Sequence, residues 1–143
     1  MKTLNGKANA GFTLIEIMLV IIIVVALMAV LIPNLKTALT DSKRGQAEIY
    51  INQLQGDIAI YEASNGYPPT TAQGLRALVE MPQGEPRPRK WSKREDEIKL
   101  DPWGMEYRYE FPGRRNKNGA DIFSCGPDRQ QDTADDIGNW RSE

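Results

Sequence analysis

Hydrophobic positions follow two different patterns along the chain. Residues 12–32 are apolar almost throughout, with Glu16 near the front edge of the run. About 20 residues at a rise of 1.5 Å per residue cover the ~30 Å hydrocarbon core of a bilayer. The first pattern therefore predicts a membrane-spanning helix over residues 12–35. Residues 36–143, called the head below, are more polar and are expected to form one small soluble domain.

The second pattern is a helical period that begins after the apolar run. Apolar residues recur at spacings of four and three on one face of a helix. They are Ala47, Ile51, Leu54, Ile58 and Tyr61. We expect the helix to continue to about Ser64, kinked or loosened near Pro33, and to stop at Gly66. Gly45 and Gly56 are poor helix formers, so tertiary packing has to stabilise this segment.

The remaining elements are predicted to be short. Thr70 and Gln73 are spaced as in a capping box, which predicts a short helix over residues 75–79. Residues 81–99 are rich in proline and mixed charges and are expected to be irregular. Three strands are expected, at residues 105–111, 122–124 and 137–140. The order of elements predicts an α+β fold, with a long N-terminal helix packed on a small antiparallel sheet.

Composition and charge exclude several classes of function. The net charge of −1 and the pI near 5.6 lack the basic footprint of a nucleic-acid-binding protein, so we expect no nucleic-acid partner. A single cysteine, Cys125, cannot form an internal disulfide. The chain has no histidine, which removes a Ser-His-Asp triad and the usual imidazole metal sites. These absences argue against an enzyme.

The polar leader, residues 1–11, precedes the apolar run. A secretory signal peptide would have a shorter apolar core and a cleavage site after it. Lys2 and Lys7 place the leader in the cytoplasm by the positive-inside rule, and the head then lies outside the membrane. The basic residues on the other flank weaken this argument when it is taken alone; they are Lys36, Lys43 and Arg44.

Glu16 is an unusual residue for a membrane helix, because a buried charge costs several kcal/mol and commonly marks a functional partner. Two interpretations stay open from physics alone. Glu16 lies close to the interface, so it could snorkel or take up a proton at modest cost. Alternatively, cleavage between Gly11 and Phe12 would create an amino group four residues before Glu16. In a bundle of such helices this amine could neutralise a neighbour's carboxylate, which would couple insertion to self-assembly.

Residues 124–140 form an acidic loop in which Arg129 is the one opposing charge among four aspartates. The aspartates are Asp128, Asp132, Asp135 and Asp136. Such carboxylates repel one another unless they are solvated or bridged by a cation. Oxygen ligands in a flexible loop favour calcium, although the spacing does not match an EF-hand. Composition by itself favours an ordinary Asp-rich turn.

The sequence GFTLIE at residues 11–16 resembles the class III signal of type IV pilins and pseudopilins. The resemblance implies that a prepilin peptidase cuts between Gly11 and Phe12. The same enzyme would methylate the new N-terminus, which becomes N-methylphenylalanine at Phe12. It also implies that Glu16 sets the register of subunits during filament assembly.

Four further segments resemble the major pseudopilins of type II secretion systems. They are YPPTTAQGL at 67–75, DPWG at 101–104, DIFSCGPD at 121–128 and DDIGNW at 135–140. The resemblance implies a calcium ion in the acidic loop, which would hold the C-terminal segment on the sheet. The implied side-chain ligands are Asp128, Asp135, Asp136 and Thr133, with the backbone carbonyls of Cys125 and Gln130.

Four residues in or near this implied site need separate comment. Arg129 stands where the family often has glycine. Asp132 could take the place of Thr133 or Gln130 as a ligand. Asp121 is interpreted as structural, and the Cys125 side chain is expected to be a small packed group with no thiol chemistry.

The resemblance implies a structural subunit that polymerises in the periplasm and helps to drive folded proteins through an outer-membrane secretin. Its implied partners are further copies of itself, minor pseudopilins, the prepilin peptidase, an inner-membrane assembly platform with its ATPase, the secretin, and membrane lipid before assembly. One alternative is a type IV pilin of a surface pilus, for adhesion, motility or DNA uptake. Such pilins commonly carry a C-terminal disulfide, which one cysteine cannot form. A membrane-anchored periplasmic enzyme is the other alternative.

Overall fold

The structure is a computed structural model that describes residues 11–140, apart from the side chain of residue 33. The leader lysines Lys2 and Lys7 lie outside the described residues. The described part of the chain contains one α-helix, α1 (Leu14–Asn65), and a short 3-10 helix, η1 (Leu75–Leu78). Its three strands are β1 (Arg108–Glu110), β2 (Asp121–Ser124) and β3 (Ile137–Gly138). The chain divides between Thr40 and Asp41 into two compact units, which are described separately.

The first unit contains the beginning of α1. Its described side chains are all exposed, and the helix continues without interruption through residue 33. An 18-residue window of α1 has a mean hydropathy of 3.3, and none of that window is buried. By length and composition, α1 is the one helix within residues 11–140 that could cross a membrane.

The second unit contains the rest of α1, which buries one face. The buried residues on this face include every member of the predicted stripe. They are Ala47, Tyr50, Ile51, Leu54, Ile58 and Tyr61. The helix ends at Asn65, one residue beyond the predicted position. Gly66 follows with φ of 84° and donates its N–H to the Glu62 carbonyl at 2.7 Å, which closes the last turn.

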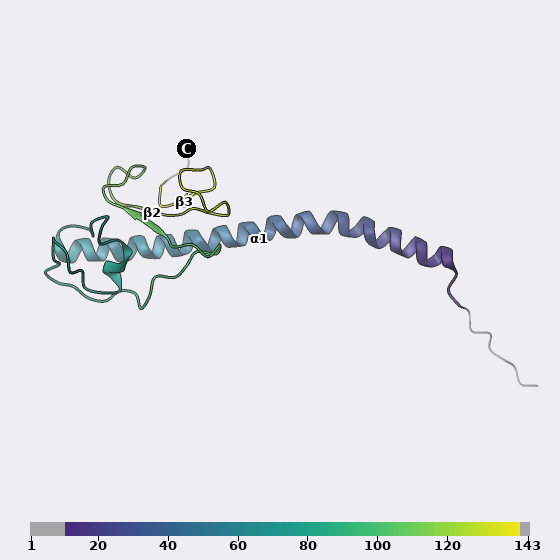
Figure 1. The fold of residues 1–143 in the computed structure, drawn as a ribbon, viewed down its shortest axis with the longest axis horizontal. Helices are drawn as coiled ribbons and strands as arrows, with labels where there is room; N and C mark the ends of the chain where they lie inside the picture. The colour runs from purple at the N-terminus through teal and green to yellow at the C-terminus, as the bar shows by residue number, and fades with distance from the viewer. Residues whose placement is uncertain (1–10, 141–143) are drawn as a thin grey trace, which may run out of the picture. The chain divides into compact units, whose positions relative to one another are not determined.

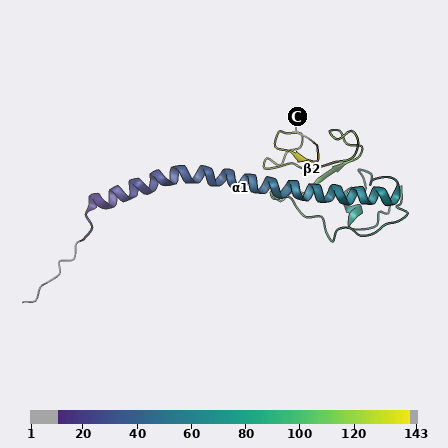
Figure 2. The same cartoon turned by 180° about the vertical axis from the view of Figure 1, so that it is seen from behind.

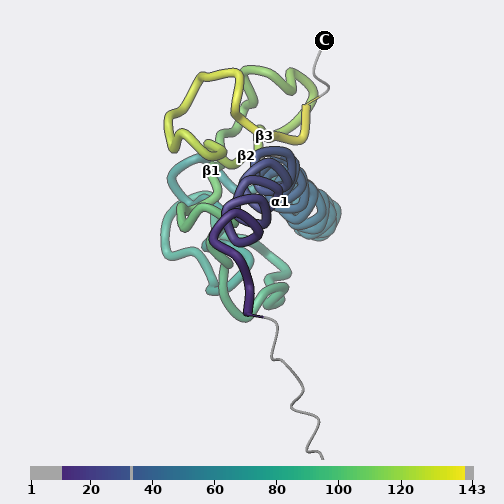
Figure 3. The backbone as a smooth tube through the Cα atoms, turned by 90° about the vertical axis from the view of Figure 1, so that its right-hand side faces the viewer, coloured from purple at the N-terminus to yellow at the C-terminus, as the bar shows by residue number. Residues whose placement is uncertain are grey.

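The sheet is antiparallel with the order β1-β2-β3, and Figure 3 shows the three strands next to one another beside α1. In the pairing, Tyr109 lies opposite Ile122, and Ser124 lies opposite Ile137. Ile122 and Ile137 join the buried face of α1 in one hydrophobic core. The ring of Tyr107 packs 5.2 Å from that of Tyr50, between centroids. The predicted α+β architecture is therefore confirmed.

Two strands are shorter than predicted. β1 covers three residues because Glu106 pairs with Leu100 instead of β2. Beyond the other end of β1 the chain turns, and the Arg114 N–H donates to the carboxylate of Asp121. β3 covers two residues because Asn139 leaves the ladder and bonds Ile122 through both its backbone and its side chain.

The segment between α1 and the sheet is mostly irregular, as predicted for residues 81–99. The capping box is present, since Thr70 Oγ1 accepts from Gln73 N–H at 3.2 Å and Gln73 Oε1 accepts from Thr70 N–H at 3.0 Å. The helix that follows is the single 3-10 turn η1. Trp91 ties the irregular segment to η1, because its indole N–H donates to the Ala77 carbonyl at 2.8 Å. In Figures 1 and 2 this segment and the C-terminal loops lie on different sides of the end of α1.

Candidate functional site: the acidic loop and the start of the long helix

The acidic loop connects two strands that are paired with each other. Because Ser124 of β2 lies opposite Ile137 of β3, the residues at the two ends of the loop are held side by side. Gly126 has φ of 66°, and a Cβ built there would overlap the carbonyl oxygen of Asp135. Only glycine allows the two ends to approach so closely. The pairing therefore brings the Cys125 backbone near Asp135 and Asp136.

Within the loop, four of the predicted ligands share one hydrogen-bonded turn. Asp128 Oδ1 accepts from the N–H of Gln130 at 2.9 Å. The Thr133 hydroxyl donates to the Gln130 carbonyl at 3.3 Å and accepts from the Asp135 N–H at 3.3 Å. Arg129 has φ of 59°, a left-handed conformation that favours glycine, which accounts for the glycine implied at this position by the resemblance.

The carboxylate of Asp136 has different partners. Its Oδ2 accepts from the backbone N–H of Asp132 at 2.9 Å and from Arg115 at 3.4 Å. Its Oδ1 is buried and has no hydrogen-bond partner within residues 11–140. Burial raises the pKa of Asp136, while the Asp132 N–H and the Arg115 guanidinium act in the opposite direction.

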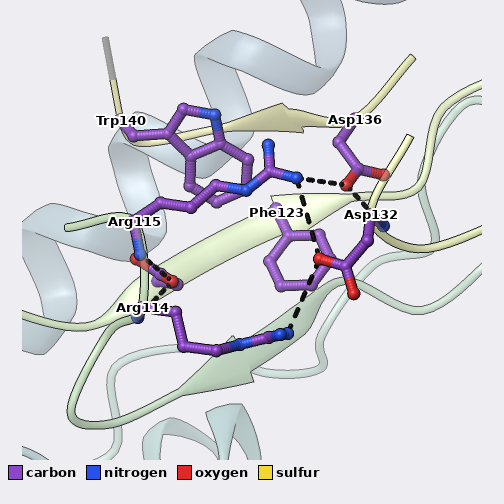
Figure 4. Close-up of a pocket in the computed structure, with 7 residues that line it drawn as sticks. Arg114, Arg115, Phe123, Asp132, Asp136 and Trp140 are labelled. Carbon is purple, nitrogen blue, oxygen red and sulfur yellow. Dashed lines mark hydrogen bonds and ion pairs between the residues drawn. The ribbon is translucent and has the colours of Figure 1, made fainter. Parts of the chain in front are cut away.

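Arg115 lies at the centre of a charged cluster between the β1–β2 loop and the acidic loop (Figure 4). Its guanidinium contacts Asp132 at 3.7 Å and lies over the Trp140 ring at 4.5 Å from the centroid. Arg114 also reaches Asp132 at 3.7 Å and pairs with Glu110 at 2.9 Å. The cluster borders a cavity of about 210 Å³. Sequence reasoning missed Arg115, and the one feature of the sequence that could have indicated it is its position in a turn-rich segment.

The loop residues fit a calcium ion by their chemistry. Every predicted donor is an oxygen atom, which is what calcium prefers. Asp136 Oδ1 is a buried acceptor that still lacks a partner among the described residues. Within residues 11–140, three acidic side chains do not gather at one point, and Asp136 is held by Arg115 and by the Asp132 N–H. The candidate site therefore consists of donors that share one turn, together with the buried carboxylate of Asp136.

Two buried aspartates outside the donor set stabilise the surroundings of the acidic loop, Asp121 by bonding the β1–β2 loop and Asp101 by bonding the start of the acidic loop. Asp121 accepts from the N–H groups of Arg114, Arg115 and Asn116 at 2.7 to 2.9 Å, which confirms its structural role. Asp101 accepts from the Ser124 hydroxyl at 2.5 Å, and that hydroxyl accepts from the Gly126 N–H at 3.0 Å. This buried chain links the DPWG turn to the start of the acidic loop.

The thiol of Cys125 is buried, and burial raises its pKa above the ordinary value. A thiol with a raised pKa holds little of the reactive thiolate at neutral pH. The observation agrees with the small packed residue expected from the sequence.

The predicted processing residues lie just before α1, and Glu16 lies in its first turn. Gly11, Phe12 and Glu16 are all exposed. Thr13 Oγ1 accepts from the Glu16 N–H at 3.3 Å, and Glu16 Oε2 accepts from the Thr13 N–H at 3.5 Å. This is a reciprocal capping box, and the carboxylate also lies at the positive end of the helix dipole. Sequence reasoning missed it, although Thr13 and Glu16 show its T-x-x-E spacing.

Comparison with known families gives two matches on this chain. Residues 34–140 match the family described as type II secretion system (T2SS), protein G. Residues 6–32 match the prokaryotic N-terminal methylation motif. The two matches together cover both patterns of hydrophobicity described above.

Curated relatives carry the same description. The type II secretion system core protein G of Dickeya chrysanthemi is 43% identical over 136 residues, which is 94% of this chain and 88% of that protein. The core protein G of Pseudomonas aeruginosa is 37% identical over 142 residues, covering 96% and 99% of the two chains.

A solved structure shows the same fold. It is the crystal structure of the major pseudopilin from the type 2 secretion system of enterohaemorrhagic Escherichia coli. The TM-score is 0.69 at 38% sequence identity, and the match covers 76% of this chain and 91% of that one.

Proposed function

The chain belongs to the protein G family of the type II secretion system, and from this premise we propose how its two sites serve the pseudopilus. It is a structural pseudopilin subunit and not an enzyme. Its function is to polymerise into the periplasmic pseudopilus that helps to drive folded proteins through the outer-membrane secretin. The observation that carries this conclusion is the family match over residues 34–140. The apolar first part of α1, which is not buried within the molecule, agrees with it. The methylation motif does not distinguish this function from a surface type IV pilus, whereas the match over residues 34–140 and the relatives name the type II secretion system.

Before assembly, the exposed apolar part of α1 anchors the subunit in the bacterial inner membrane, with the head in the periplasm. The prepilin peptidase cuts between Gly11 and Phe12, which are exposed and therefore accessible to a protease. The methylation motif at residues 6–32 supports N-methylation of the new terminus at Phe12. Minor pseudopilins, the assembly platform with its ATPase, and the secretin are the further partners.

Glu16 pairs with the Phe12 amino group of a neighbouring subunit during assembly. Its bond to the Thr13 N–H is long, at 3.5 Å, and its carboxylate is exposed, so it can accept a stronger donor. An ammonium group in a low-dielectric fibre core is such a donor. The pairing satisfies a charge that would otherwise be costly to keep within hydrocarbon.

Substitutions can separate the pairing from the capping box. Glu16→Ala and Glu16→Gln are expected to leave insertion and cleavage intact and to abolish filaments, because both remove the negative charge. Thr13→Ala removes the cap and keeps the charge, so it is expected to retain most filaments. The measurement is the yield of sheared pseudopili in cells that overproduce the system, with leader cleavage followed by mobility on gels. Normal filament yield from Glu16→Gln would rule out the pairing, and equal losses in all three variants would assign the effect to the cap.

The acidic loop binds calcium and thereby holds the C-terminal segment on the sheet. The donors are the side chains of Asp128, Thr133, Asp135 and Asp136 and the carbonyls of Cys125 and Gln130. The ion, when bound, supplies positive charge that neutralises clustered carboxylates. The shared turn of residues 128–135 and the paired strands at the loop base support this assignment.

Chelation tests this part of the proposal. Saturation at about 100 times the dissociation constant stabilises a native state by ~2.7 kcal/mol, which is roughly 10 °C in melting temperature for a domain of this size. The full chain in neutral detergent should therefore melt about 10 °C lower with excess chelator than with calcium. Asp135→Ala with Asp136→Ala should melt low in both conditions. The matched control, Asp96→Ala with Glu97→Ala, removes the same charge from an exposed segment and should respond like the unmodified chain. An unchanged midpoint on chelation would exclude the calcium site.

A further inference from the structure

Arg115 is placed to neutralise the acidic loop from within the molecule. The side chain of Asp136 is 1% exposed, and Arg115 is the one cation that pairs with it among residues 11–140. A buried carboxylate without a partner costs several kcal/mol, so losing the cation of this pair should destabilise the head more than losing one from the exposed ion pairs elsewhere on the head. The arginine is in turn fixed by its position over Trp140 and by its second contact with Asp132.

The two oxygens of Asp136 have separate environments. Oδ2 accepts from Arg115 and from the Asp132 N–H, whereas Oδ1 is buried and unpartnered. One carboxylate can accept from several donors through its two oxygens. Arg115 therefore holds Asp136 through one oxygen and leaves the other available.

We propose that Arg115 is an internal counter-ion that keeps Asp136, and with it residues 132–140, against the sheet when no divalent cation is bound. Arg115 is a positioning residue, and within residues 11–140 its side chain forms no hydrogen bond or ion pair with the other proposed ligands. The second part of the inference rests on the proposed calcium site: Arg115 and calcium neutralise the same carboxylate, so each becomes more important when the other is missing.

The neighbouring arginine provides a matched control. Arg114 has the same charge, and its ion-pair partners Glu110 and Asp132 are at least one third exposed. It forms no ion pair with Asp136 within the described part of the chain. Arg114→Gln and Arg115→Gln therefore remove the same net charge from adjacent positions, and only the second leaves Asp136 without its cation. Exposed pairs contribute little to stability, so Arg114→Gln should have a small effect.

The test compares these two variants and the unmodified full chain in detergent, with calcium and with excess chelator. In chelator, Arg115→Gln should melt well below Arg114→Gln. Calcium should restore Arg115→Gln to near the unmodified chain. Its chelation shift should therefore be larger than that of the unmodified chain, because chelation then removes the last cation that neutralises the buried carboxylate. Hydrogen exchange should accelerate at residues 126–140 of chelated Arg115→Gln, and not at residues 47–61 of α1. Arg115→Lys should be intermediate, because an ammonium group cannot reproduce the contacts of a planar guanidinium.

The outcomes separate the two proposals. Equal melting of Arg114→Gln and Arg115→Gln in chelator would overturn the counter-ion role of Arg115. If Arg115→Gln is destabilised equally with calcium and with chelator, the claim that Arg115 and calcium neutralise the same carboxylate is overturned. If the unmodified chain does not respond to chelator, the calcium site itself is wrong, and the comparison of the two arginine variants in chelator still decides the role of Arg115.

Discussion

The helix α1 contains two regions with opposite relations to solvent. From Leu14 to Thr40, every described side chain is exposed, and Leu27 has 59% of its surface accessible. From Asp41 to Asn65, one face is buried, and Leu54 has no accessible surface. The same backbone conformation thus carries two different kinds of hydrophobic sequence. The difference shows that helix formation and burial are separate requirements.

The physical reason is the distribution of apolar residues around the helix. A stripe with a 3.6-residue period can be covered by one small sheet, as it is in the head. A segment that is apolar on all sides has no polar face to leave in water. In the function proposed above, lipid would cover this segment before assembly and other helices would cover it afterwards.

The sharpest test of this comparison exchanges leucine for alanine in each region. Leu54→Ala should lower the free energy of unfolding of the head by about 3 kcal/mol, since it leaves a cavity in a closed core. Leu27→Ala removes the same atoms from an exposed position and should leave the melting of the head unchanged. Thermal unfolding of both variants, followed by circular dichroism in detergent, measures the difference. A comparable loss in Leu27→Ala would mean that the first region also stabilises the head.

Two tyrosines on the buried face of α1 should respond in opposite directions to the loss of a hydroxyl. Tyr61 Oη is buried without a hydrogen-bond partner among the described residues, so Tyr61→Phe should stabilise the head by about 1 kcal/mol. Tyr50 Oη accepts from the Lys99 N–H at 3.1 Å, so Tyr50→Phe should destabilise it by a similar amount. Denaturant unfolding of the two variants gives both values. Destabilisation by Tyr61→Phe would show that its hydroxyl has a partner in solution.

The smallest effect is expected on the exposed face of α1. Apart from its two chain neighbours and the backbone of its own helix turns, no described atom lies within 4 Å of a Cβ built at Gly56. Gly56→Ala should therefore stabilise the head by roughly 0.5–1 kcal/mol through helix propensity. Gly126→Ala is the contrasting variant, because its Cβ would overlap the Asp135 carbonyl. It should destabilise the head and open the acidic loop. The melting temperatures of the two variants should therefore move in opposite directions.

The sequence by itself determined the elements that depend on local pattern. The stripe from Ala47 to Tyr61, the end of α1, the irregular segment 81–99 and the sites of the three strands all follow from periodicity and turn residues, which act over a few positions. The processing residues and the donors of the acidic loop also came from the sequence, as motifs, and their roles stay predictions. The capping box of Thr13 and Glu16 had a sequence signal that was overlooked.

Only the tertiary structure decided which distant groups meet. Arg115 and Asp136 are 21 positions apart, and no periodicity connects them. The β1–β2 loop and the acidic loop leave β2 at opposite ends, so their contact requires the two loops to fold toward each other across the sheet, where Arg115 meets Asp132 and Asp136. A separate pairing shortened β1, since Glu106 pairs with Leu100 instead of β2. Local sequence specifies what each segment can become, whereas the long-range folding of the loops over the sheet fixes which charges neutralise one another.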